Sequence, residues 1–264
     1  MAGYNMTINL AAVVGQLQRS LQHSFDRVSL GLLAADKMTS EELTLQGSWQ
    51  QLSLTGKELR TADTIKEDFN NWILANGFRD CTEAIGAYLE EVRNVCTVLS
   101  FSGKMTGEDW NDNIVQGAKK FHRLGLPDKI NDLKDQHDPV LVTGYVDDIL
   151  SINTARNCLV HRNGIVSGRD VNSPDGMLVQ WRKMEIVVEG RAGRRAVVPP
   201  ASLEKGELVT MQLVNTNKIF KLGEMVVFSA QEFSDVCLTL FFWGKNLVSL
   251  VEDYARKKGV PFNT

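Results

Sequence analysis

Apolar residues recur at steps of three and four along the first part of the chain, which is the period of one face of an α-helix. One such stripe occupies residues 10–32 and another occupies residues 85–99. The first consists of Leu10, Val13, Val14, Leu17, Leu21, Phe25, Val28 and Leu32, and the second of Ile85, Tyr88, Leu89, Val92, Val95, Cys96 and Leu99. The pattern predicts two long amphipathic helices, the second of which ends near Phe101.

Shorter helices are expected in the next part of the chain. One ends near Phe121, and Pro127 suits the first turn of another, because a proline there gives up no intrahelical hydrogen bond. A further helix is expected from about Val140 towards His161. The Asn-Gly pair at residues 163–164 predicts its end, since both residue types readily adopt the left-handed conformation that terminates helices.

Beyond residue 164 the pattern changes from helical to alternating. Residues 177–228 alternate apolar and polar positions and are rich in β-branched side chains, which is typical of strands. The segment LVNTNKIFKL, residues 213–222, has the turn chemistry of a hairpin. We therefore expect a small antiparallel sheet to be inserted at this point of the chain.

A last helix is predicted from Ser229 to about Lys257. Ser229 and Glu232 form a capping box at its start. Its apolar residues are Phe233, Val236, Cys237, Leu240, Phe241, Phe242, Trp243, Leu247, Val248, Leu250, Val251 and Tyr254. They cover nearly the whole circumference, which favours burial on two sides, against the helical bundle and against a second subunit.

Together these elements predict a mainly α fold, an antiparallel helical bundle with a small inserted antiparallel β-sheet. We assign residues 1–165 to the bundle, residues 166–228 to the inserted sheet, and residues 229–264 to a C-terminal helix that completes the bundle or the dimer interface. The chain has 264 residues, of which 43% are hydrophobic, so it is long enough to bury a core without disulfides. Its net charge of −3 does not indicate a polyanion partner.

Several features favour a cytoplasmic protein without a membrane partner. The four cysteines are widely spaced, lie in apolar surroundings and form no Cys-x-x-Cys pair, which is typical of reduced core thiols. The first residues lack the basic head and continuous apolar run of a signal peptide. The most apolar window, residues 236–251, is too short to span a bilayer and contains Lys245.

The end of the helix that leads to His161 carries polar side chains in positions where a buried helix would carry apolar ones. A projection at about 100° per residue places Arg156 in the inward sector. That sector comprises Val142, Val146, Ile149, Asn153, Arg156 and Val160. A buried guanidinium requires a carboxylate, carbonyl or phosphate partner, and Glu90 and Glu91 are candidates.

Asn157 and His161 are four residues apart, so the Asn157 amide is expected to hydrogen-bond the imidazole and fix its tautomer. Arg156 and His161 are about 140° apart around an ideal helix. They can therefore meet one substrate atom only if the helix loosens near Gly164, or if two copies of the chain face each other.

The spacing Arg-Asn-x-x-x-His at Arg156, Asn157 and His161 resembles the R-x(4–6)-H signature of the HEPN superfamily (higher eukaryotes and prokaryotes nucleotide-binding). The following Arg162 and Asn163, with Gly164, are similar to continuations common in that family. The resemblance covers the helical bundle and not residues 177–228. It implies a homodimeric, metal-independent endoribonuclease with a composite site at the dimer interface. It also implies a toxin or antiviral effector, with a cognate antitoxin or regulatory protein as a possible partner.

Arg156, Asn157 and His161 are the catalytic candidates. Cleavage of RNA without a metal requires removal of the 2′-hydroxyl proton, stabilisation of the charged phosphorane and protonation of the leaving 5′-oxygen. Histidine is suited to proton transfer near neutral pH, so His161 is the candidate general acid or base. Arg156 would hold the phosphoryl oxygens, and Asn157 would orient the imidazole. Two histidines brought together in a dimer would give a 2′,3′-cyclic phosphate and a 5′-hydroxyl.

The segment from Arg156 to Arg195 contains eight Lys and Arg residues and four Asp and Glu residues. This local positive charge makes it a candidate RNA-binding surface, with GRAGRR at residues 190–195 as a hairpin tip. The RNA-binding candidates are Arg162, Asn163, Arg191, Arg194 and Arg195. The alternative is that this basic tip is simply a solvated loop.

Other readings remain open at this stage. The alternative function is a non-catalytic helical dimer that binds RNA or a partner protein, in which Arg156 and His161 only join a helix end to its neighbours. No metal site or cofactor is expected, because the remaining histidines, His23, His122 and His137, are isolated in the sequence. The calcium-loop-like segment at residues 109–120 has Ile114 where such a loop requires glycine.

Overall fold

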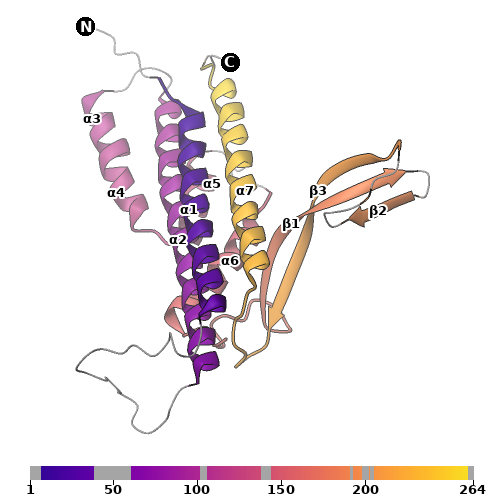
Figure 1. Ribbon diagram of the computed structural model, residues 1–264. Helices are drawn as coiled ribbons and strands as arrows, with labels where there is room; N and C mark the ends of the chain where they lie inside the picture. The colour runs from indigo at the N-terminus through magenta and orange to yellow at the C-terminus, as the bar shows by residue number, and fades with distance from the viewer. Residues whose placement is uncertain are drawn as a thin grey trace, which may run out of the picture.

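The computed structural model describes residues 7–38, 61–101, 106–137, 144–190, 193–197, 202 and 205–260. Within them, the long helices α1 (Leu10–Lys37), α2 (Ala62–Ser100) and α7 (Ala230–Lys257) lie side by side (Figure 1). The shorter helices are α3 (Gly107–Asp109), η1 (Trp110–Gln116, a π-helical stretch), α4 (Gly117–His122), α5 (Leu126–Gln136) and α6 (Val146–His161). The strands are β1 (Met177–Gly190), β2 (Gly193–Val197) and β3 (Leu208–Phe220). The expectation of a mainly helical fold with a small antiparallel sheet is confirmed.

Side-chain caps explain why the long helices begin where they do. Asn9 Oδ1 accepts a hydrogen bond from the Ala12 N–H of α1 at 2.9 Å. At α7 the predicted capping box is present, because Ser229 Oγ accepts the Glu232 N–H and the Glu232 carboxylate accepts the Ser229 N–H. These bonds satisfy backbone donors that have no partner inside the helix.

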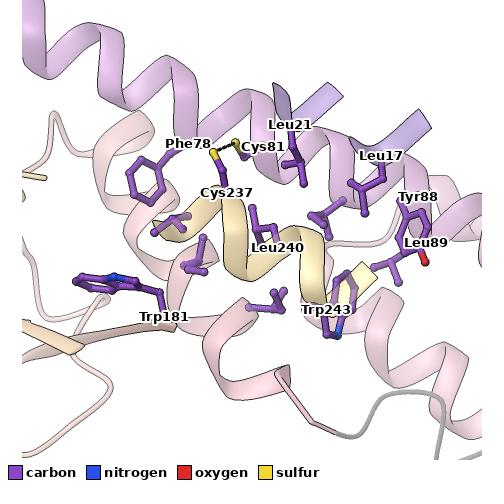
Figure 2. Close-up of a cluster of buried hydrophobic side chains, with 14 of the residues drawn as sticks. Leu17, Leu21, Phe78, Cys81, Tyr88, Leu89, Trp181, Cys237, Leu240 and Trp243 are labelled. Carbon is purple, nitrogen blue, oxygen red and sulfur yellow. Dashed lines mark hydrogen bonds between the residues drawn. The ribbon is translucent and has the colours of Figure 1, made fainter. Parts of the chain in front are cut away.

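Helix α7 lies at the centre of the core, which agrees with its wide apolar circumference. Leu240 and Trp243 of α7 are both buried in this core (Figure 2). Gly244 allows α1 to approach, because a Cβ at this position would lie only 2.3 Å from a Leu17 methyl carbon. The predicted burial of the cysteines is confirmed, and the Cys81 and Cys237 sulfurs lie 3.7 Å apart as free thiols.

No described helix is both long enough and apolar enough to cross a membrane.

The described strands form one antiparallel sheet in the order β2-β1-β3. The predicted hairpin turn in residues 213–222 is wrong, since β3 runs without interruption to Phe220 and Thr216 pairs with Trp181. The asparagines on either side, Asn215 and Asn217, are exposed on the outer face, where a polar side chain does not disturb the strand. Neither asparagine has the positive φ that a tight hairpin turn requires.

The sheet and the bundle share one core. On the half of β1 nearest the bundle, Met177, Val179 and Trp181 point inward and join the same buried cluster as the helices. Beyond them, the far halves of β1 and β3, together with β2, project away from the bundle (Figure 1). We call this projecting part, residues 183–190, 193–197 and 208–214, the distal arm.

Hydroxyl groups from two helices cover the edge of β1 where β2 does not reach. Ser151 Oγ on α6 accepts the Gln180 N–H at 2.8 Å and donates to the Gln180 carbonyl at 3.2 Å. Thr239 Oγ1 on α7 accepts the Arg182 N–H at 2.8 Å and lies 3.1 Å from the Arg182 carbonyl. These two side chains satisfy the backbone groups that a neighbouring strand would otherwise pair.

We expect Thr239→Val to lower the free energy of unfolding by about 1–3 kcal/mol, because it leaves the Arg182 N–H buried without an acceptor at nearly unchanged volume. Thr154→Val is the matched control, since the Thr154 hydroxyl bonds only the Leu150 carbonyl of its own helix. Urea unfolding of both variants measures the difference. Equal stability of the two variants would show that the hydroxyl does not support the sheet edge.

Candidate functional site

The candidate site lies at the end of α6. The helix starts at Val146, later than the expected Val140, because Gly144 has a φ of 90° and is not helical; residues 138–143 lie outside the described part. Its predicted end is confirmed, since Asn163 and Gly164 have positive φ values of 52° and 75°. The Gly164 N–H donates to the Cys158 carbonyl at 3.1 Å, which closes the last turn.

Arg156 and His161 come together within one chain. Arg156 Nη1 lies 3.0 Å from Asn157 Oδ1 and 3.3 Å from His161 Nε2. A guanidinium only donates hydrogen bonds, so in this contact Nε2 is the acceptor and the imidazole proton is on Nδ1. The long arginine side chain spans the angle between the two positions, and neither a loosened helix nor a second copy is required for the contact.

The predicted inward sector of α6 is wrong in its direction. The described core-facing residues of the helix are Asp148, Ile149, Ser151, Ile152, Ala155, Cys158 and Leu159. Arg156 and Val160 are half-buried beside this stripe, and Val142 lies outside the described residues. The projection failed because α6 is packed between α2 and β1, so burial on two sides hides the simple amphipathic pattern.

Asn157 does not have the contact that the spacing suggested. Its amide oxygen accepts from Arg156, and no hydrogen bond joins Asn157 to His161. The residue that touches the imidazole is therefore Arg156, and Asn157 instead holds the guanidinium. His161 is exposed, whereas Arg156 Nε is buried and has no hydrogen-bond partner among the described residues.

Neither proposed acidic partner reaches Arg156. Glu90 accepts from Lys129 Nζ at 2.5 Å and lies 3.0 Å from His122 Nδ1, and Glu91 is exposed on α2. The guanidinium of Arg156 thus has no carboxylate among its described hydrogen-bond partners. Its cationic group remains available to an anionic ligand.

The chain just after His161 is anchored by a buried ion pair. The Arg162 guanidinium donates two hydrogen bonds to the Asp170 carboxylate, one from Nε at 2.7 Å and one from Nη2. Ser167 donates to the same carboxylate from its backbone N–H at 2.9 Å and from its hydroxyl at 2.8 Å. Burial acts to raise the pKa of Asp170, but the hydrogen bonds from Ser167 and Arg162 outweigh it and hold the pKa below its usual range.

The RNA-binding candidates are dispersed in the structure. Arg162 is bound to Asp170, and Asn163 is an exposed turn residue beside His161, so their contact with RNA stays a prediction. Arg194 contacts Gln212, and Arg195 is paired with Glu207 at 3.1 Å. These two arginines lie on the distal arm, and Arg191 lies outside the described residues.

The distal arm is far from His161. On α6, Asp148 pairs with Arg182 of β1, and Ser151, one turn later, contacts Gln180. Helix α6 therefore runs towards the start of β1, away from the distal arm, as it approaches His161. From Gln180 to the arm tip at Gly190 is roughly 30 Å along the strand. The structure does not bring Arg194 and Arg195 together with the Arg156–His161 pair.

The sequence analysis missed Asp170 as the anchor of this segment. The signal is the spacing Ser-x-x-Asp at residues 167–170, in which the acidic side chain turns back to the serine N–H. Among the described residues no group of three His, Cys, Asp or Glu side chains is placed to hold a metal ion.

The fold and the site define a mainly helical protein with a small antiparallel sheet and, at a helix end, a half-buried arginine in contact with an exposed histidine. Comparisons with protein-family models, with curated proteins and with solved structures find no match to this chain. The HEPN resemblance therefore depends on Arg156, Asn157 and His161 and on their helical surroundings.

Proposed function

We propose that the protein is a metal-independent endoribonuclease of HEPN type that acts as a homodimer through Arg156 and His161. The observation that supports this most strongly is the 3.3 Å contact between Arg156 Nη1 and His161 Nε2 at the exposed end of α6. It places a permanent cation and a proton acceptor within the width of one phosphodiester group. Such an enzyme fits the toxin or antiviral effectors that the resemblance implies.

The arrangement suits 2′-hydroxyl attack on the adjacent phosphate. A phosphate that reaches the pair takes the Arg156 guanidinium as its counter-ion, which frees the His161 Nε2 lone pair for the 2′-hydroxyl proton. The 2′-oxygen then bonds to phosphorus, and the 5′-oxygen leaves with a proton from a second imidazole. In the proposed dimer that imidazole is His161 of the partner subunit. The products are a 2′,3′-cyclic phosphate and a 5′-hydroxyl.

An exposed apolar surface beside the pair supports association of two copies. Ile165 and Met225 form an antiparallel bridge, and both are exposed, as is Val227 on the same segment. The Met225 sulfur lies against Gly164, 3.0 Å from where a Cβ would stand, so this surface adjoins the helix end that carries His161. A twofold axis through it would place two Arg156–His161 pairs in one cleft.

The test is incubation of purified protein with a labelled structured RNA in excess EDTA, followed by mass analysis of the product ends. We expect cleavage to persist in EDTA and to leave 2′,3′-cyclic phosphate. Cleavage that requires a divalent metal, or RNA binding without cleavage across a panel of RNAs, would contradict the proposal. The latter result would favour the non-catalytic RNA-binding dimer.

We expect Arg156→Lys to reduce the single-turnover cleavage rate by about tenfold to a hundredfold, because an ammonium keeps the charge but loses the planar fork. Arg169→Lys is the matched control, since Arg169 is exposed in the loop after α6 and makes no contact with His161. Quenched single-turnover assays measure both rates. An equal loss in both variants would mean that the fork of Arg156 has no special role.

A further inference from the structure

Within the described residues, the outer edge of β3 has no neighbouring strand. β3 is an edge strand of thirteen residues, and its described partner is β1. No backbone group of β3 that points away from β1 has a hydrogen-bond partner in the described part of the chain. The side of β1 that β2 does not cover is treated differently, since Ser151 and Thr239 cap the backbone of Gln180 and Arg182 there. An edge strand of this length with unpaired backbone N–H and C=O groups can pair with another strand.

The distal arm also carries an apolar face that points away from the bundle. Direct strand pairing puts Met184 beside Leu213 and Ile186 beside Met211, on the same face of the sheet. In the middle of the sheet this face carries the polar side chains Gln180, Arg182, Asn215 and Asn217, and the apolar face there is the inner one that holds Trp181. The apolar side therefore changes from the inner to the outer face along the strands, and Met211 is 70% exposed.

β3 lacks the features that normally protect an edge strand. Natural edges are protected by charged side chains, especially Lys, or by Pro, bulges or a covering element. Residues 208–217 contain no charged side chain and no proline. The nearest cation on the strand, Lys218, is already bound to Glu232 of α7. An antiparallel copy of this segment would meet no like charge.

We propose that β3 pairs antiparallel with β3 of a second copy of this chain, about a twofold axis near Met211. Residues opposite each other in an antiparallel pair lie on the same face, so Met211 meets its own copy and Val209 meets Leu213 of the partner subunit. The two apolar faces become continuous, and the two sheets become one. A second copy is favoured over a foreign strand because it supplies a strand of equal length without charge.

The shape of the molecule permits this pairing. The distal arm stands clear of the helices, so a second arm can lie along β3 without contacting the bundle (Figure 1). The surface around Met225, next to the Arg–His pair, is at the other end of the sheet. The β3 pairing is therefore separate from the dimer proposed for catalysis and holds whether or not the protein cleaves RNA.

The experiment uses the full chain with Met225→Glu, which removes the other proposed contact surface, and measures mass in solution by light scattering across a concentration series. We expect this protein to be dimeric. Adding Met211→Lys should weaken association at least about tenfold, because the two lysines then face each other across the new strand pair. Adding Leu213→Lys should also weaken it, because each lysine then faces the apolar Val209 of the partner subunit.

Met184→Lys is the matched control, since Met184 lies on the same face but on β1, one strand away from the edge. It should leave the dimer intact, and circular dichroism checks that all variants are folded. A Met225→Glu chain that is monomeric at every concentration overturns the proposal. So does a dimer that survives both Met211→Lys and Leu213→Lys. A monomer that instead captures an extended peptide at β3 also overturns it, in favour of a foreign strand.

Discussion

Replacing Asp170 by alanine is expected to lower the free energy of unfolding by about 3 kcal/mol, which is large for one residue. The Asp170 carboxylate is fully buried and accepts hydrogen bonds from both the Arg162 fork and Ser167. Its removal leaves a guanidinium, three-quarters buried, without its counter-ion, together with unpaired donors. This loss of stability is at the lower end of the range for breaking buried ion pairs, because the Arg162 side chain is still partly exposed to water.

Chemical unfolding of Asp170→Ala beside Asp175→Ala measures this effect, since Asp175 is exposed in the same loop. The pH dependence gives an independent check. Because the pKa of Asp170 is held below its usual range, its stabilisation is present above the unfolded-state pKa of about 4 and is lost as the pH falls through the lower folded-state pKa. The two variants should therefore converge in stability in strong acid. A constant difference down to low pH would show that the carboxylate charge is not the cause.

Much of the helical architecture could be predicted because helix periodicity and caps are local. The stripe from Leu10 to Leu32 and the capping box at Ser229 each depend on neighbours within one turn, and both are present in the structure. The hairpin expected at residues 213–222 failed for the opposite reason. The asparagines in this segment are residues that favour turns locally. The segment is nevertheless extended, because β3 pairs with β1 along its whole length.

The charge count along the chain failed for a related reason. Of the eight cations between residues 156 and 195, two are paired in space with acids that the linear window does not include. Arg182 pairs with Asp148 at 3.0 Å, and Arg195 pairs with Glu207 at 3.1 Å. Asp148 precedes the window and Glu207 follows it. At the site itself, Arg156 has no acidic hydrogen-bond partner in the described structure, and it is the cation that contacts His161.

If the proposed function holds, replacing His161 by alanine is expected to reduce RNA cleavage by about 10²–10⁴-fold, because the variant loses the proposed acceptor of the 2′-hydroxyl proton. RNA binding should change little, since Arg156 keeps its charge. His122→Ala is the matched control: it removes an exposed histidine of α4 that pairs with Glu90 and does not touch Arg156. Single-turnover assays compare the three proteins, and free imidazole should partly restore cleavage by His161→Ala, whose imidazole site is open to solvent.

The proposed division of acid and base roles between two subunits leads to a further prediction. If each cleavage uses one His161 from each subunit, a dimer with one wild-type and one His161→Ala chain lacks half of the proton transfer. An equimolar mixture that exchanges freely should then retain roughly a quarter of the wild-type activity, because about one dimer in four has both histidines. Retention of half the activity would mean that each subunit acts alone. The imidazole that protonates the 5′-oxygen would then have to be replaced by water or by another group of the same chain.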